Sequence, residues 1–375
     1  MHSEFIILGA GISGISTSYF LEKSGFSSII LDISNPLSGS GSTMKSAGII
    51  SHFFPFKEEI KAVSNSLKFY DEIINDSSEN ISYNNSGLLA FCNNSDKETL
   101  SQFLDAMKSS NADYSLFDSK ELSDIYPMLS IPSDEIAVIS KNSGYYDINH
   151  LFPIIIKQLK SKNINFFNNI EIKTIEHQNY FTFNTNHGIF TSDKVIITGG
   201  AWSNKIANMF NCTINFDTYS TQAAIFSIPQ AYNNDLSSLP ILYKMSNGVY
   251  GRPVSSSSFL FGDGSTKYSG DPDNFKFKND KNFLEYMLQQ ANTFFPNQKI
   301  GPVQKNWSGL YTSSEDSRPL IGQLDDDIFF LGCFNGLGIM LAPGCSKLLV
   351  DSITKNIIND DFSPFNIQRF NNNNI

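Results

Sequence analysis

A glycine-rich turn near the start of the chain constrains its fold more than any other feature. The apolar run Phe5–Leu8, typical of a strand buried on both faces, leads directly into the sequence GAGISG at residues 9–14. A helical pattern follows, and a second apolar run, Ser28–Leu31, ends at Asp32. This order predicts a β-α-β unit that binds the pyrophosphate of a dinucleotide. Asp32 can accept hydrogen bonds from ribose hydroxyls, and its charge disfavours a 2′-phosphate.

The residue types in this turn follow from its geometry. Gly9 permits a tight turn, Gly11 lets the backbone approach a phosphate, and Gly14 lets the helix pack closely on the strand. The amides of Ile12 and Ser13 lie at the start of the helix, where the positive end of the helix dipole attracts an anion. We therefore expect these five residues to contact the cofactor.

Composition and charge exclude several classes of protein. The chain has 375 residues, which favours about two domains, and its hydrophobic fraction of 41% suffices for a large core. The net charge is −10 and no basic run occurs, which argues against nucleic-acid binding. Four cysteines without CxxC spacing predict neither a disulfide framework nor a metal site. Without a signal-peptide pattern or a run of about 18 apolar residues, we expect a soluble, cytoplasmic protein with no transmembrane segment.

A second segment of small and hydroxylated residues follows Asp32. Residues 39–50 read GSGSTMKSAGII, and such residues suit close contact with a second phosphate and a flat ring. A surface loop could have the same composition, so this segment alone leaves both interpretations open. The candidate cofactor contacts in it are Ser42, Thr43, Ser46, Ala47, Gly48 and Ile49.

Three further blocks follow later in the chain. Residues 194–203 predict a buried strand that ends in glycines and an aromatic residue. The pattern W-x-G-x-Y at 307–311 precedes D-x-x-P-x-x-G at 316–322. A strand at 329–332 leads into a second glycine-rich turn at 334–338 and then into a helix. The candidate cofactor contacts in these blocks are Thr198, Gly199, Trp202, Gly309, Gly336, Leu337, Gly338, Ile339 and Met340.

The order of these blocks resembles the FAD-dependent amine and amino-acid oxidoreductases of the D-amino-acid oxidase superfamily. The likeness is greatest to sarcosine oxidase, glycine oxidase and the flavin subunits of dye-linked proline dehydrogenases. It rests on GAGISG with Asp32, GSTMKSAGII, the strand ending in TGGAW, the patterns W-x-G-x-Y and D-x-x-P-x-x-G, and NGLGIMLAP. It covers nearly the whole chain and implies FAD as the cofactor. We also expect Ile172, in a β-ribbon formed by residues 165–176 and 180–191, to contact FAD.

The resemblance implies an α/β fold, α+β overall, with a discontinuous Rossmann-like FAD-binding domain and a mostly antiparallel β domain that binds the substrate. The short apolar runs between Asn, Ser, Pro and Gly in the expected substrate domain fit strands and hairpins. The expected FAD-binding segments are 1–84, 142–214 and 301–375, and the expected substrate-binding segments are 85–141 and 215–300.

The implied reaction is oxidation of the C–N bond of a small amino acid or secondary amine, of the glycine, sarcosine, proline or D-amino-acid type, by hydride transfer to flavin. The turn at 336–339 can stabilise the negative charge of the reduced ring, because backbone amides and the helix dipole meet there. A substrate carboxylate favours an arginine, and Arg252 is the first candidate, with Tyr250 and Tyr311 as hydroxyl partners. A surface salt bridge is the alternative role of Arg252. Lys45 and His52 are secondary candidates.

Departures from the family pattern affect the expected chemistry. Sarcosine oxidases attach flavin through a cysteine where this chain has Gly309, and related dehydrogenases use a histidine where residues 43–45 stand, so noncovalent FAD is expected. Ser51 and Met340 replace an arginine and a lysine of sarcosine oxidase, which puts sarcosine itself in doubt as the substrate. The oxygen-activating lysine falls near Leu260. We therefore expect a dehydrogenase more than an oxidase, with a quinone, a dye-like carrier or a partner subunit as electron acceptor in preference to O₂.

Three other functions stay open at this point. The chain could be the flavin-bearing subunit of a heteromeric dehydrogenase. It could be a hydroxy-acid or glycerol-phosphate dehydrogenase on the same fold, although the few Lys and Arg residues near the substrate segments disfavour a phosphate ligand. An NAD-dependent Rossmann enzyme is disfavoured by the C-terminal glycine-rich turn.

Overall fold

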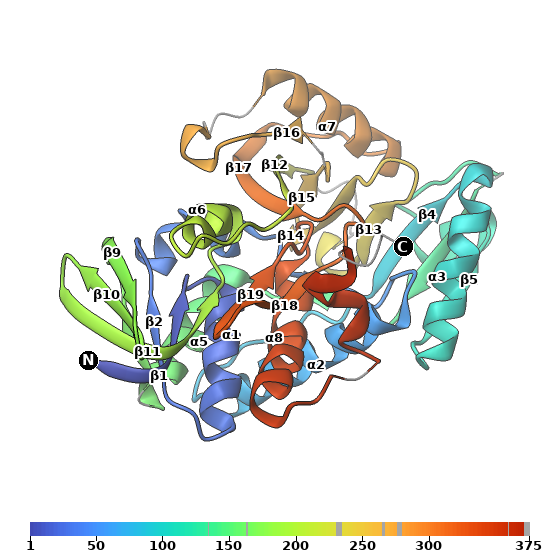
Figure 1. Cartoon of the computed structure of the whole chain (residues 1–375). Helices are drawn as coiled ribbons and strands as arrows, with labels where there is room; N and C mark the ends of the chain where they lie inside the picture. Colours follow the sequence, from blue (N-terminus) through green and yellow to red (C-terminus); the bar gives the residue numbers. More distant parts are fainter. Residues whose placement is uncertain are drawn as a thin grey trace.

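Two large sheets lie one above the other in the molecule (Figure 1). The computed structural model describes residues 1–133, 135–162, 164–229, 235–264, 267–275, 280–358 and 360–370. Within them, one sheet has eight strands and the other has nine. This mixed α/β arrangement, with two mainly sheet-built halves, confirms the expected fold class.

The eight-stranded sheet has the order β18-β19-β11-β1-β2-β8, and β10 and β9 continue from β11. Neighbours from β19 to β8 run parallel, whereas β18 and the β9–β10–β11 ribbon are antiparallel. Its strands are β1 (His2–Leu8), β2 (Ser28–Leu31), β8 (Asn165–Phe167), β9 (Ile172–His177), β10 (Phe181–Thr185), β11 (Gly188–Ile197), β18 (Leu320–Asp325) and β19 (Ile328–Gly332).

The two faces of this sheet belong to different cores. Along β1, Phe5 and Ile7 face the helices, and Ile6 and Leu8 face the β9–β10 ribbon, as the alternation of a strand requires. Helix α8 packs against both α1 and α2. The helices of this half are α1 (Ile12–Lys23), α2 (Lys57–Asn75), α5 (Ile148–Ser161), α6 (Ser203–Asn208) and α8 (Gly338–Lys355).

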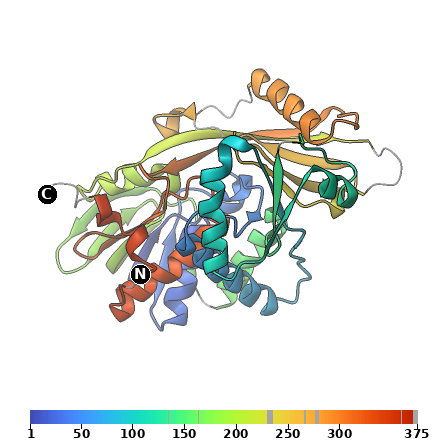
Figure 2. The same ribbon diagram turned by 90° about the vertical axis from the view of Figure 1, so that its right-hand side faces the viewer.

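The nine-stranded sheet has the order β16-β12-β15-β14-β13-β4-β6-β5, with β17 paired to β12. All its pairs are antiparallel except β4 with β13. Helix α7 covers its outer face (Figure 2). Its elements are β4 (Leu88–Cys92), α3 (Lys97–Ser109), β5 (Tyr114–Phe117), α4 (Ser119–Ile125), β6 (Ile136–Ser140), β12 (Asp217–Ser227), β13 (Ile241–Lys244), β14 (Tyr250–Ser255), β15 (Ser258–Gly262), β16 (Lys267–Tyr268), α7 (Lys281–Phe294) and β17 (Val303–Ser313).

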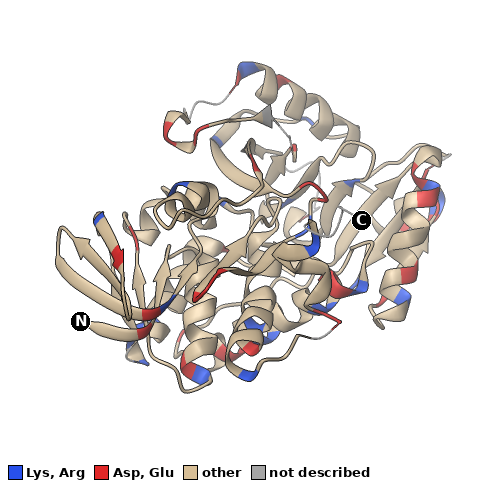
Figure 3. Ribbon diagram, viewed as in Figure 1, with Lys and Arg blue, Asp and Glu red and all other residues tan. Residues whose placement is uncertain are grey.

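Shorter elements complete the chain, and charged residues are distributed over both halves (Figure 3). A two-stranded ladder joins β3 (Ile49–Ile50) to β7 (Gly144–Tyr145). The 3₁₀ helices are η1 (Pro36–Ser38), η2 (Thr43–Lys45), η3 (Asn94–Asp96), η4 (Gly200–Trp202), η5 (Leu236–Ser238), η6 (Pro272–Asn274), η7 (Ser363–Phe365) and η8 (Ile367–Phe370).

Three features differ from the sequence-based expectations. Helices α3, α4 and α7 lie in segments expected to contain strands and hairpins, because their apolar residues recur at helical spacing, as Leu100 and Met107 do in α3. Residues 165–167 pair with β2 instead of joining the ribbon. Strand β17 lies in the nine-stranded sheet, so its pairing groups residues 303–313 with the expected substrate-binding segments.

Candidate active site

The GxGxxG turn is packed so closely that two of its glycines have no space for a side chain. A Cβ atom on Gly14 would lie 1.9 Å from the carbonyl oxygen of Gly9, and one on Gly9 would lie 2.6 Å from that of Thr198. Gly9 also has a φ angle of 116°, which disfavours other residues. These contacts hold the first turn of α1 against the carboxyl ends of β1 and β11.

Asp32 and the 39–50 segment surround the same helix start. The carboxylate of Asp32 accepts hydrogen bonds from the amide of Ala10 at 2.7 Å and from the amide of Ser34 at 2.8 Å. The hydroxyl of Thr43 accepts a hydrogen bond from the amide of Ile12 at 3.1 Å. Gly11, the N-cap residue of α1, has no side chain to cap the helix, so Thr43 provides the acceptor for its first amide, and the positive end of the helix dipole lies at this turn.

Hydrogen bonds fix the 39–50 segment to the nine-stranded sheet. The hydroxyl of Ser42 donates to the carbonyl oxygen of Leu310, and the indole nitrogen of Trp307 donates to that of Lys45 at 2.9 Å. The side chain of Lys45 lies beside Gly309, since a Cβ atom there would be 3.4 Å from its Cδ. The two halves of the molecule therefore meet along η2 and β17.

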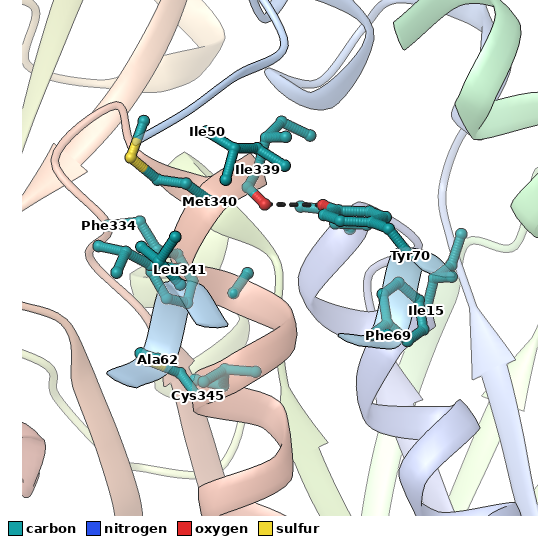
Figure 4. Close-up of a cluster of buried hydrophobic side chains, with 14 of the residues drawn as sticks. Ile15, Ile50, Ala62, Phe69, Tyr70, Phe334, Ile339, Met340, Leu341 and Cys345 are labelled. Atoms are coloured by element: carbon teal, nitrogen blue, oxygen red, sulfur yellow. Dashed lines mark hydrogen bonds between the residues drawn. The ribbon is translucent and has the colours of Figure 1, made fainter. Parts of the chain in front are cut away.

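A buried tyrosine holds the start of α8. The hydroxyl of Tyr70, which is fully buried, donates to the carbonyl oxygen of Ile339 at 2.7 Å (Figure 4). Helix α2 also approaches α8 closely, because a Cβ atom on Gly344 would lie 2.1 Å from the carbonyl oxygen of Ala62. These two contacts fix the N-terminal half of α8 relative to α2.

These segments enclose a cavity of about 510 Å³, within the roughly 300–1,000 Å³ typical of ligand sites. Of the predicted substrate contacts, Tyr250, Tyr311 and Lys45 line it. Burial raises the pKa of both tyrosines to about 12, so both are hydroxyl donors at neutral pH. The predicted cofactor contacts that line it are Ser42, Ser46, Ala47, Ile49, Gly309, Gly336, Leu337, Ile339 and Met340.

Four charged residues among the described ones line this cavity. Burial lowers the pKa of Lys45 to about 8. Arg318 donates from Nε to Glu59 at 2.6 Å and from its terminal nitrogen at 2.9 Å, and its guanidinium lies 4.3 Å from the ring centre of Phe56. Asp316, the fourth, accepts two hydrogen bonds from Arg369 at 2.8 and 2.6 Å. The sequence did not reveal the Arg318–Glu59 pair, because 259 positions separate its members.

Two of the predicted substrate contacts do not line the cavity. Arg252 donates from Nε to the carbonyl oxygen of Ala47 at 2.5 Å and stacks over the ring of Tyr145 at 4.5 Å. It takes part in none of the ion pairs of the described residues, so a surface salt bridge does not describe it either. The buried ring of His52 lies 3.1 Å from the carbonyl oxygen of Asn142 and 3.2 Å from the hydroxyl of Ser64, and burial lowers its pKa.

The remaining predicted cofactor contacts have other surroundings. The amides of Ser13 and Gly14 lie in the first turn of α1, and the carbonyl oxygen of Gly199 accepts a hydrogen bond from the amide of Trp202 at 3.1 Å. The indole of Trp202 donates to Asp273 at 2.7 Å. Ile172 packs against the core below the β9–β10 ribbon, and the amide of Ile170, two residues before it, donates to the carbonyl oxygen of Asp32.

Metal-binding clusters and membrane-spanning helices are both absent from the described residues. The described residues contain no cluster of three or more His, Cys, Asp or Glu side chains arranged to hold a metal ion. None of the helices in the described part of the chain has the length and apolar character needed to cross a bilayer.

Comparison with known proteins identifies the family to which this site belongs. Residues 4–352 match the family of FAD dependent oxidoreductases designated DAO, and the chain belongs to it. The chain is therefore an FAD-dependent oxidoreductase, which confirms the expected superfamily and cofactor.

Individual relatives are distant, and several of them cover nearly the full length of the chain. Monomeric sarcosine oxidase from Bacillus sp. (strain NS-129) is 22% identical over 98% of this chain and 97% of its own. N-methyl-L-tryptophan oxidase from Yersinia pestis (strain Pestoides F) is 23% identical over 54% of each. Among solved structures, L-proline dehydrogenase from P. horikoshii has a TM-score of 0.86 at 21% identity, over 99% of this chain and 98% of its own. Glycine oxidase from Geobacillus kaustophilus has a TM-score of 0.81 at 18% identity, over 98% and 99%.

Proposed function

We propose that this protein oxidises the C–N bond of an amino acid or secondary amine with noncovalently bound FAD and passes the electrons to an acceptor other than oxygen. The observation that carries the proposal is the single cavity where η2, β17 and the start of α8 meet. The relatives named as sarcosine, glycine and N-methyl-L-tryptophan oxidases and as L-proline dehydrogenase act on substrates of this kind.

The residues present fit FAD. The amides of the first turn of α1 would hold the pyrophosphate, and Asp32 would bind the ribose of the adenosine. The small residues of the 39–50 segment and Gly309 leave space for a flat ring in the cavity. When bound, the flavin accepts the hydride equivalent from the substrate carbon.

The surroundings of the cavity favour noncovalent attachment. None of the described residues that line it is Cys or His, the residues that tether flavin in the related enzymes. Cys345 is buried at α8 and Cys92 lies in β4, and burial raises the pKa of both thiols, so neither is a nucleophile at neutral pH.

The chain's own groups bind and orient the substrate in this proposal. Lys45 would attract the substrate carboxylate, with the hydroxyls of Tyr250 and Tyr311 as donors beside it. Arg252 would act indirectly, because its hydrogen bond to Ala47 fixes the backbone of the flavin segment. The amides at the start of α8, which Tyr70 holds in place, would face the negative charge that develops on the ring.

In this proposal the reduced flavin passes its electrons, as in a dehydrogenase, to a quinone, a dye-like carrier or a partner subunit. Oxygen reduction begins with an electron transfer that forms superoxide, so a fixed cation beside the ring accelerates it. The family resemblance puts two lysines of the oxidases at Met340, in the cavity wall, and near Leu260, which is buried in β15 and is not among the residues that line the cavity. Lys45 is the cavity cation whose effect on oxygen has to be measured.

The test is to reduce the protein anaerobically with its substrate and compare reoxidation by air and by a soluble dye. We expect the dye to act much faster than air. Fast reoxidation by air with stoichiometric peroxide would contradict the dehydrogenase part of the proposal, and slow reoxidation in a Lys45→Met variant would then identify Lys45 as the cation responsible.

Two alternative functions would give different results. If the chain is the flavin-bearing subunit of a heteromeric complex, its activity alone is weak and a partner chain restores it. Bleaching by hydroxy acids but by no amine would favour a hydroxy-acid dehydrogenase.

A further inference from the structure

One end of the cavity is lined by aromatic and aliphatic side chains from four separate elements. Phe53 and Phe54 come from the segment before α2, Phe103 from α3 and Tyr243 from β13. Leu88 of β4 completes this group, which we call the aromatic end. None of these five residues belongs to η2, β17 or the start of α8, which would hold the cofactor.

The geometry of the aromatic end is well defined. The ring centres of Phe53 and Phe103 are 4.5 Å apart with an interplanar angle of 35°, and those of Phe53 and Tyr243 are 6.4 Å apart at 66°. Tyr243 and Ile241 are two positions apart in β13 and so share a face of the sheet, and Leu88 lies opposite Ile241 in the register. The rings of Phe53, Phe103 and Tyr243 thus form one apolar wall of the cavity, to which the sheet contributes Tyr243 and Leu88.

Three of the four charged residues that line the cavity are held in ion pairs. Arg318 is bound in two places by Glu59, and Asp316 is bound in two places by Arg369. Each of these charges is thus neutralised by a partner and does not draw a charged group of the substrate toward the aromatic end.

On the basis of the function proposed above, we propose that the substrate is an amino acid or N-alkyl amino acid with a bulky apolar side chain or ring, which fills the aromatic end. Phe103 and Tyr243 are the specificity-determining residues. Glycine and sarcosine have no side chain that could displace water from these rings, whereas a leucine- or phenylalanine-sized group buries its apolar surface there. A missing methylene in a hydrophobic pocket changes kcat/KM by roughly 10-fold or more, so the loss of a whole side chain has a large effect.

The first experiment compares substrates that differ only in this group. Racemic N-methylleucine and N-methylphenylalanine, sarcosine and glycine are each mixed anaerobically with the FAD-loaded protein, and the rate of flavin bleaching is measured against concentration. We expect the two bulky substrates to exceed sarcosine at least about 10-fold in the apparent second-order rate constant. Equal or faster bleaching by sarcosine would overturn this inference and leave the proposed function intact. Bleaching by no amine at all would overturn the proposed function itself.

A binding measurement tests the inference without turnover. 3-Phenylpropionate and acetate are carboxylates that the flavin cannot oxidise at a C–N bond, and each is titrated while the flavin absorbance is followed. We expect at least about 10-fold tighter binding of 3-phenylpropionate, because only it reaches the apolar wall. Equal affinity of the two carboxylates would contradict the inference.

Two variants on one helix locate the effect. Phe103→Ala removes a ring from the aromatic end, whereas Leu104→Ala alters the next residue of α3, which is also partly buried but does not line the cavity. We expect Phe103→Ala to weaken 3-phenylpropionate binding several-fold and leave acetate binding unchanged, and Leu104→Ala to change neither. Equal losses in both variants, or a loss of both ligands in Phe103→Ala, would assign Phe103 a structural role and overturn its part in specificity.

Discussion

Replacement of Gly14 by alanine tests the packing of the dinucleotide turn. A Cβ atom at this position would lie 1.9 Å from the carbonyl oxygen of Gly9 and 2.7 Å from the hydroxyl of Thr198, and that hydroxyl itself donates to Gly9. The nearest opposing atom belongs to the backbone of β1, so no side-chain rotation can relieve the contact. Helix α1 would have to move away from β1 by roughly 1 Å, a large shift in an interior that is close-packed.

In Gly14→Ala, the better helix propensity of alanine opposes the cost of overpacking. Alanine is more favourable than glycine within a helix by up to about 1 kcal/mol. Overpacking a rigid interior typically costs about 1–3 kcal/mol, and a backbone contact this short belongs at or above the upper end of that range. We therefore expect a net loss of roughly 1–3 kcal/mol in the free energy of unfolding. FAD should also bind at least about 10-fold more weakly, because the amides of the first turn move with the helix and each charge-assisted hydrogen bond contributes about 1.5–3 kcal/mol.

Gly11 and Gly41 provide matched controls. A Cβ atom on Gly11 would meet only the hydroxyl of Thr43 at 3.2 Å, and its φ of −69° suits alanine. Gly11→Ala should therefore fold normally and still lose FAD affinity, since its methyl group obstructs the approach of the pyrophosphate. A Cβ atom on Gly41 would meet no protein atom within 4 Å, so Gly41→Ala should leave the free energy of unfolding unchanged.

The assay measures urea unfolding of the three FAD-depleted variants and FAD binding by quenching of flavin fluorescence. The reasoning is refuted if Gly14→Ala unfolds at the same urea concentration as Gly41→Ala and binds FAD as tightly as the unsubstituted protein. Full FAD affinity in Gly11→Ala would show that the phosphates do not approach this turn.

Three further predictions follow from the site. Acid denaturation should release all the flavin as free FAD, and flavin that stays on the denatured chain would contradict noncovalent binding. Because burial lowers the pKa of Lys45 to about 8, its ammonium charge is lost as the pH rises through that value. The affinity for 3-phenylpropionate should therefore fall above pH 8 and become independent of pH in Lys45→Met, whereas the same pH profile in both proteins would remove Lys45 from the carboxylate site. Tyr70→Phe leaves the buried carbonyl oxygen of Ile339 without its donor and should cost about 1–3 kcal/mol in urea unfolding, and an unchanged midpoint would refute the role of this hydrogen bond.

Much of the cofactor site could be predicted from local sequence. The strand at Phe5–Leu8, the turn at 9–14 and the helix that ends at Lys23 agree with the pattern, because each depends on residues fewer than about five positions apart. The glycines are required by contacts within the unit or with the end of a neighbouring strand. Family order then supplied the later blocks, and those at 307–311, 316–322 and 334–341 line the same cavity as residues of the 39–50 segment, nearly 300 positions away.

The substrate end could not be predicted in the same way. Arg252 was the first candidate for a substrate carboxylate, but its guanidinium donates to the carbonyl oxygen of Ala47 and lies over the ring of Tyr145, residues from two other segments. Phe103 lies on a helix that was expected to be a strand or hairpin, so its side chain was assigned to no site. The sequence assigned no role to Arg318, yet it pairs with Glu59 in the cavity wall.

The sequence by itself therefore determined the β-α-β unit, the cofactor class and the family, because steric limits at glycine and the periodicity of apolar residues are local properties that a linear pattern records. Only the tertiary structure decided which cations are paired with carboxylates and which aromatic side chains form the apolar wall of the cavity. Hydrogen bonds, ion pairs and ring contacts depend on separations of a few ångströms, and the folding of two sheets against each other sets those separations between residues as distant as Glu59 and Arg318.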